Sequence, residues 1–276
     1  MNLQNILNEI EKADPEVFEK ISPRRSVIRN WGKTIALTAI PFALGSMFKK
    51  AYGQVNSTII DTLNFALTLE YLEAEFYNTA LSATTLNIPT DAARGAITTI
   101  STHENQHVAF LRKVISDAGS TPVTKPTFDL SGGNGTGTGP FAQAFSDYDL
   151  FLAVAQTLED TGVRAYKGQA GNLMENNTYL TAALNIHSVE ARHASHIRQM
   201  RRARGGAAAN NKPWITGKDT GGIPENLVGP NYAGEDATTQ AGVNIAGFVS
   251  VNAATEAFDE ILTKEAVLAI VDPFIV

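Results

Sequence analysis

An internal repeat constrains this chain more than any other feature of its sequence. Each copy has a Glu that is followed, 34 residues later in the first copy and 31 in the second, by Glu-x-x-His. The repeated residues are Glu70, Glu104 and His107 in the first copy, and Glu159, Glu190 and His193 in the second. A chain with five His is expected to show fewer than one Glu-x-x-His by chance. Two matches in register therefore indicate a duplicated structural unit.

The repeat lies within four long segments that have apolar residues at three- and four-residue spacing, which predicts amphipathic helices. These segments are residues 57–81, 90–118, 144–174 and 178–204. Short joins connect the first to the second and the third to the fourth, whereas a stretch rich in Thr, Pro and Gly separates the second from the third. Two helical hairpins joined by one long crossover predict an all-α four-helix bundle.

The repeated acids lie in the apolar stripes of these helices, where they require a compensating charge. Residues at i and i+3 share one helix face, so each Glu-x-x-His can clamp one cation. Four carboxylates in a low-dielectric core would repel one another and take up protons, whereas two divalent cations would balance them with both imidazoles neutral. The chain has no Cys, so any metal must be held by Asp, Glu and His. We therefore predict a buried dinuclear metal site.

Residues 57–204, and the run Leu-Glu-Tyr-Leu-Glu-Ala-Glu-Phe-Tyr at 69–77 in particular, resemble the ferritin-like superfamily and its desiccation-related branch. The resemblance implies a ferritin-like four-helix bundle that holds two divalent ions, Fe or Mn, and meets dioxygen or peroxide as a small-molecule partner. It implies six ligands: Glu70, Glu104, His107, Glu159, Glu190 and His193. It also implies that Glu104 and either Glu159 or Glu190 bridge the ions. Tyr77 and Tyr166, the candidate catalytic residues, would hydrogen-bond in the core or assist electron transfer.

Several neighbouring residues leave alternatives open. Glu73 lies one turn from Glu70, but the second copy has Gly162 in its place, so Glu73 is either an additional ligand or a group beside the ligands. The residues at 103–107 spell the H-E-x-x-H of zinc metalloproteases. Val189 stands where the second copy would repeat the first of those histidines, and we therefore favour the dimetal interpretation. The remaining histidines are His187 and His196, which are surface or cap residues or lie near the site.

The N-terminal segment, residues 1–53, resembles a bacterial twin-arginine export signal. Arg24 and Arg25 precede an uncharged run over residues 34–48, although Pro23 and Val27 depart from the usual pattern. The run is shorter than the roughly 18 apolar residues that a bilayer span requires, so we expect no stable membrane span. The resemblance implies an exported or periplasmic protein. The alternative is an amphipathic N-terminal helix with a solvated arginine pair.

We expect three parts: residues 1–53, the bundle over 54–204, and an extension over 205–276. The extension is rich in Gly, Asn, Ala and Pro and should cover the bundle irregularly before ending in a packed helix over 254–270. The acids of that helix should form a solvated face; they are Glu256, Asp259, Glu260 and Glu265. Asp and Glu outnumber Lys and Arg after residue 53, which argues against a nucleic-acid partner. A homo-dimer is a further partner that we consider.

The leading hypothesis is an exported protein whose dinuclear non-haem Fe or Mn centre reacts with dioxygen or peroxide under oxidative or desiccation stress. Such a protein would be a dimetal oxidase, peroxidase or catalase-type oxidoreductase. The alternative is a non-catalytic bundle that protects or scaffolds, in which the metals serve stability alone. A zinc metalloprotease built on His103-Glu104-Asn105-Gln106-His107 is the third hypothesis.

Overall fold

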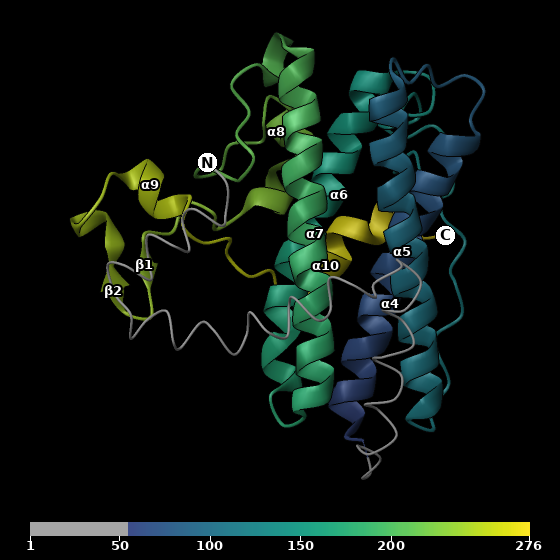
Figure 1. Ribbon diagram of the computed structural model, residues 1–276, viewed down its shortest axis with the longest axis vertical. Helices are drawn as coiled ribbons and strands as arrows, with labels where there is room; N and C mark the ends of the chain where they lie inside the picture. The colour runs from purple at the N-terminus through teal and green to yellow at the C-terminus, as the bar shows by residue number, and fades with distance from the viewer. Residues whose placement is uncertain (1–54) are drawn as a thin grey trace, which may run out of the picture. The chain divides into compact units, whose positions relative to one another are not determined.

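Four long helices, arranged as two antiparallel pairs, dominate the computed structural model, which describes residues 55–276. They are α4 (Ser57–Ser82), α5 (Asp91–Asp117), α6 (Tyr148–Gln169) and α7 (Asn177–Arg204). Helix α4 packs along α5, and α6 packs along α7, so that two hairpins lie beside each other (Figure 1). This arrangement confirms the all-α bundle of two hairpins joined by a long crossover. The predicted export signal lies outside the described residues.

Polar side chains fix where the four helices begin. Each cap accepts hydrogen bonds from backbone N–H groups of the first turn, which have no partner inside the helix. The caps are Asn56, Thr90, Asp147 and Asn176. The third helix starts at Tyr148 and not at Ala144 as predicted, because residues 141–146 form turns before the Asp147 cap. It continues into a short 3₁₀ turn, η1 (Ala170–Leu173).

Apolar side chains of both hairpins and of the C-terminal segment share one core. Phe76 of α4 stacks on Phe151 of α6 with ring centroids 5.1 Å apart, which joins the hairpins. The crossover is tied to the C-terminus, since Phe128 pairs with Ile275 and the Val276 N–H donates to the Thr127 carbonyl at 3.0 Å. Within residues 55–276, every helix is too short or too polar to cross a bilayer.

The C-terminal extension contains only short elements. They are η2 (Gly206–Ala208), α8 (Glu225–Val228), η3 (Gly229–Tyr232), β1 (Thr239–Gln240), β2 (Val243–Asn244), η4 (Ile245–Gly247), α9 (Val251–Thr255), α10 (Lys264–Val271) and η5 (Asp272–Phe274). Strands β1 and β2 pair antiparallel, and with α9 they lie to one side of the bundle, whereas α10 packs against α6 (Figure 1).

The predicted single helix over residues 254–270 is wrong, because residues 256–263 separate α9 from α10. Side chains of α6 bind the backbone there: Arg164 donates to the Glu260 carbonyl at 2.8 Å and Lys167 to the Asp259 carbonyl at 2.5 Å. These hydrogen bonds hold the segment against α6 in a non-helical conformation. Gly168 permits the close approach, since a Cβ at this position would lie 2.1 Å from the Leu262 carbonyl oxygen.

The acids of this segment are less solvated than predicted. Of the four, only Glu265 is exposed, whereas Glu256, Asp259 and Glu260 are half-buried. Glu256 accepts hydrogen bonds from Lys212 and Thr216. The contacts that bury these acids come from residues distant in the chain.

Candidate metal centre

The six predicted ligands converge in the middle of the bundle, where they form two overlapping groups of donor atoms. The first group is Glu70, Glu104, His107 and Glu190, and the second is Glu104, Glu159, Glu190 and His193. Within each group the donor atoms all lie within 4.8 Å of one another. All four Glu side chains are fully buried, and His107 and His193 are 8% and 4% exposed.

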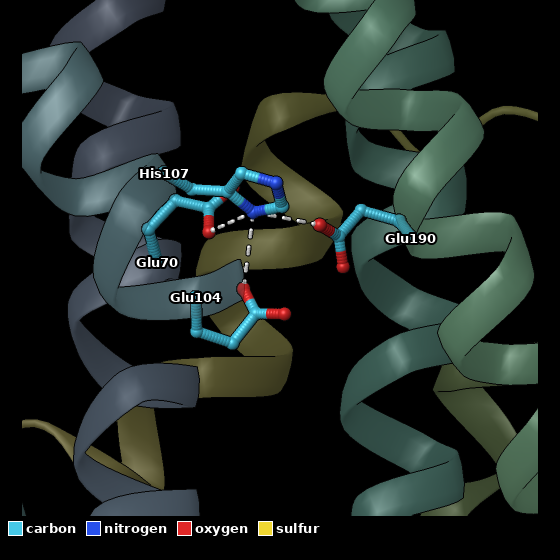
Figure 2. A group of neighbouring side chains, drawn as sticks. All are labelled: Glu70, Glu104, His107 and Glu190. Atoms are coloured by element: carbon cyan, nitrogen blue, oxygen red, sulfur yellow. Dashed lines mark hydrogen bonds and ion pairs between the residues drawn. The ribbon is translucent and has the colours of Figure 1, made fainter. Parts of the chain in front are cut away.

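In the first group, the imidazole of His107 lies among three carboxylates that come from α4, α5 and α7 (Figure 2). Its Nδ1 is 3.1 Å from Glu70 Oε2, 3.3 Å from Glu104 Oε2 and 3.1 Å from Glu190 Oε1. One ring nitrogen carries at most one hydrogen, so it cannot satisfy three carboxylate oxygens by hydrogen bonding.

The second group repeats this arrangement around His193. Its Nδ1 is 2.8 Å from Glu104 Oε1, 3.3 Å from Glu159 Oε2 and 3.7 Å from Glu190 Oε2. Glu104 and Glu190 therefore each direct one oxygen to each imidazole. Glu70 and Glu159 each contact only one imidazole. Of the two alternatives that the sequence left open beside Glu104, this pattern favours Glu190 over Glu159 as a residue that could bridge two ions.

Buried polar atoms in this cluster lack hydrogen-bond partners. In the part of the chain that the structure describes, these atoms are Glu104 Oε1, Glu159 Oε2, both carboxylate oxygens of Glu190 and Nδ1 of His193. Leaving one such atom unsatisfied costs about 1–3 kcal/mol, and more if it is charged. Carboxylate oxygens and imidazole nitrogens are ligands for Mn and Fe. The donor set fits two divalent cations, which would satisfy these atoms and balance the four carboxylates.

Without a metal, protons would provide the compensating charge. Burial raises the pKa of Glu159 to about 7, against the opposing effect of His193. Burial also raises the pKa of Glu104, with repulsion from Glu190 adding to it. Burial alone would lower the pKa of His193, but the neighbouring carboxylates outweigh it and raise the pKa to about 12. Burial alone would raise the pKa of Glu190, but electrostatic attraction to the two nearby imidazoles outweighs it and lowers the pKa.

The two predicted tyrosines brace the cluster from opposite copies of the repeat. Tyr77 donates to Glu159 Oε1 at 2.5 Å, and Tyr166 donates to Glu70 Oε1. Burial raises the pKa of both hydroxyls, so both stay neutral donors. Each hydrogen bond occupies the carboxylate oxygen that does not face an imidazole. Both tyrosines therefore hydrogen-bond in the core, while their catalytic role and their assistance in electron transfer stay predictions.

Glu73 lies beside the cluster but belongs to neither group. It is 4% exposed, and burial together with repulsion from Glu190 raises its pKa. Gly162, its counterpart in the second copy, leaves room for it. A Cβ on Gly162 would lie 3.1 Å from Glu73 Oε1 and 3.6 Å from Glu190 Oε2. The sequence showed this difference between the copies, but not that the two positions face each other.

The remaining histidines stay outside both groups. His103 Nδ1 lies 2.9 Å from His193 Nε2, so His103 contacts the cluster through another residue. A zinc metalloprotease needs both imidazoles of H-E-x-x-H on one ion. Of the two histidines in that motif here, His107 faces the carboxylates and His103 does not. His187 is half-buried and His196 is exposed. The metalloprotease motif drew attention to His103 in the sequence, but only the fold shows that it contacts His193 of α7.

Comparison with known proteins agrees with this geometry. The family described as Ferritin-like domain matches residues 58–203, just over half of the chain. The match begins in α4 and ends in α7, so it contains both copies of the repeat. Among curated proteins there is no significant match.

Proposed function

Because the chain belongs to the ferritin-like domain family, we propose that it holds two Fe or Mn ions and reacts with dioxygen or peroxide. One observation carries this proposal: Glu104 and Glu190 each direct an oxygen to both His107 and His193. These two glutamates would bridge the ions. Glu70 and His107 would complete one coordination shell, and Glu159 and His193 the other.

The side chains of this protein would bind and orient the ions and control access to them. Bound Fe or Mn supplies redox chemistry that the side chains lack. Tyr77 and Tyr166 fix the rotation of the two terminal carboxylates through their hydrogen bonds. The carboxylates are fully buried, whereas the His107 side chain keeps 11% exposure. A small oxidant would therefore approach from the side of His107 and half-buried His103.

Metal analysis of the purified protein tests the proposal. We expect two ions per chain, identified by anomalous scattering above and below the Fe and Mn edges. Glu104→Ala and His193→Ala should each reduce the metal content, while Glu265→Ala, which removes an exposed acid, should not. The absence of stoichiometric metal from the wild-type protein, after incubation with Fe²⁺ or Mn²⁺, would reject the proposal.

A second candidate function is a non-catalytic protective bundle, in which the ions only stabilise the fold. The complete burial of all four carboxylates favours it, because a closed site suits a structural ion. Consumption of dioxygen and peroxide by the metal-loaded protein separates the two functions. If both oxidants persist while chelation lowers the melting temperature, the structural function holds.

We also propose that residues 1–53 direct export, in keeping with a desiccation-related role outside the cytoplasm. The support is the Arg24-Arg25 pair ahead of the uncharged run over residues 34–48. Fusion of residues 1–53 to a folded reporter should send the reporter to the periplasm. Replacing both arginines with lysine should retain it in the cytoplasm. Equal export of the two fusions would contradict the proposal.

A further inference from the structure

His103 touches the candidate centre without facing its carboxylates. Its Nδ1 lies 2.9 Å from Nε2 of His193, and the two rings are nearly parallel, at 14°, with centroids 5.2 Å apart. Parallel rings stacked face to face would be separated by about 3.5 Å, so a contact of 2.9 Å places the nitrogens edge to edge. His193 is thus engaged at both nitrogens, with Nδ1 facing carboxylates and Nε2 facing His103.

We propose that His103 is a positioning residue, which accepts a hydrogen bond from Nε2–H of His193 and thereby holds its Nδ1 ready for an ion. The inference rests on the proposed dimetal function. A neutral imidazole carries one N–H, and a metal-binding nitrogen must be free of it. An acceptor at Nε2 therefore selects the correct tautomer and fixes the ring's orientation.

The first copy of the repeat has no equivalent of this contact. Val189 occupies the position that corresponds to His103, and a valine side chain cannot accept a hydrogen bond. In residues 55–276, no protein group hydrogen-bonds to Nε2 of His107. The two ion positions are therefore unequal, with the one at His193 better organised. This assigns a role to the first histidine of the H-E-x-x-H sequence.

Titration of the metal-free protein with Co²⁺, followed by visible absorption and calorimetry, tests this role. The wild type should bind two ions. His103→Val, which copies the other half of the repeat, should weaken one of them about 10- to 100-fold and leave the other unchanged. His103→Asn should restore most of the affinity, since its Oδ1 can take the place of Nδ1 as an acceptor. The matched control is His196→Val, which removes an exposed histidine of α7.

The reverse substitution tests the same idea by gain. Val189→His should tighten the ion at His107 and narrow the difference between the two affinities. Circular dichroism of each metal-free variant shows that it folds. Unchanged Co²⁺ binding in His103→Val would overturn the inference, as would equal weakening of both ions or an Asn variant as weak as the Val variant. If the wild type bound no Co²⁺, the proposed function itself would fail.

Discussion

Each hairpin presents two glutamates, one histidine and one tyrosine to the candidate centre, but the hairpins differ on their outer faces. Arg112 and Arg198 are equivalent in the repeat. Arg112 is exposed and donates one hydrogen bond, at 2.6 Å, to the Tyr71 hydroxyl. Arg198 is 1% exposed and binds both oxygens of Asp160, at 2.9 and 2.6 Å. The inner faces are alike because both contribute donor groups to one buried cluster, whereas each outer face matches the chain segment that covers it.

The C-terminal extension covers the second hairpin and accounts for its buried charges. The Tyr232 hydroxyl donates to Asp160 at 2.8 Å, and Arg198 donates to Asn211 at 3.2 Å. A second buried pair joins Arg164 of α6 to Glu235 of the extension at 2.7 Å. On the first hairpin, the crossover offers the Tyr71 hydroxyl a weak acceptor, the Val123 carbonyl at 3.4 Å. Its other polar contacts there, from the Val123 N–H to Asn64 and from Lys125 to Glu75, are part-buried or exposed. The polar segment that covers the second hairpin thus buries Arg198, whereas its equivalent Arg112 stays at the surface.

Loss of the buried arginine of the second hairpin should destabilise the protein most. Arg198→Met should lower the free energy of unfolding by about 3–5 kcal/mol, because it leaves Asp160 buried and unpaired. Arg112→Met, the matched variant in the first hairpin, should lower it by about 1 kcal/mol, since it removes one hydrogen bond at an exposed side chain. Urea unfolding of the two variants measures the difference. Equal losses would show that the extension does not make the outer faces unequal.

The second prediction concerns the inner faces, whose protons an ion would replace. Glu159 has a folded pKa of about 7 against 4.5, and His193 about 12 against 6.5. A raised pKa contributes stability that is complete below the unfolded value and is lost as pH rises through the folded value. The metal-free protein should therefore lose stability from pH 5 to pH 9, by up to about 1.4 kcal/mol per proton and pH unit. Glu190, whose pKa is lowered, has the opposite effect on stability, but only at acidic pH, below the usual pKa of a glutamate.

Metal binding should remove this pH dependence. Because an ion replaces the cluster's protons, the metal-loaded protein should melt at nearly constant temperature from pH 5.5 to pH 9, and metal affinity should rise with pH. Thermal melts of both forms across that range provide the measurement. A metal-free protein that became more stable with rising pH would contradict the assignment of protons to the cluster.

The helices and the converging residues could be predicted because both follow from local geometry. The i,i+3 spacing places Glu104 beside His107 on one face in any α-helix, and the repeat shows that the second hairpin does the same. Apolar periodicity similarly located the four long helices, with an error at the start of α6. There the turn before Asp147 depends on a cap and not on periodicity.

Features that depend on long-range contacts could not be predicted. The interruption at residues 256–263 arises because Arg164 and Lys167 of α6 bind backbone carbonyls more than ninety residues away. The contact between His103 and His193 likewise needs α5 and α7 in register, which no local pattern encodes. The sequence singled out His103 and His193, because a motif and the repeat contain them, but it gave no sign that Arg164 and Lys167 make long-range contacts.

The third prediction tests whether the inner faces are truly equivalent. Tyr77→Phe and Tyr166→Phe each remove a hydrogen bond to a carboxylate of the other hairpin, so each should lower stability by a similar amount, about 1.5–3 kcal/mol. Urea unfolding of the metal-loaded variants provides the measurement. Markedly different losses would break the equivalence. If one variant keeps its metal but stops consuming oxidant, that tyrosine has a catalytic role in addition.

Glu73 and Gly162 occupy an inner position at which the copies differ, and exchanging residues there should change stability least. Gly162→Ala should gain up to about 1 kcal/mol of helix propensity, but its Cβ would lie 3.1 Å from Glu73 Oε1, and crowding should cancel the gain. In a Glu73→Ala background the gain should appear. A double-mutant cycle of unfolding free energies gives the coupling, expected near 1 kcal/mol. Zero coupling would mean that Glu73 moves aside freely, and that the glycine of the second copy does not make room for the acid of the first.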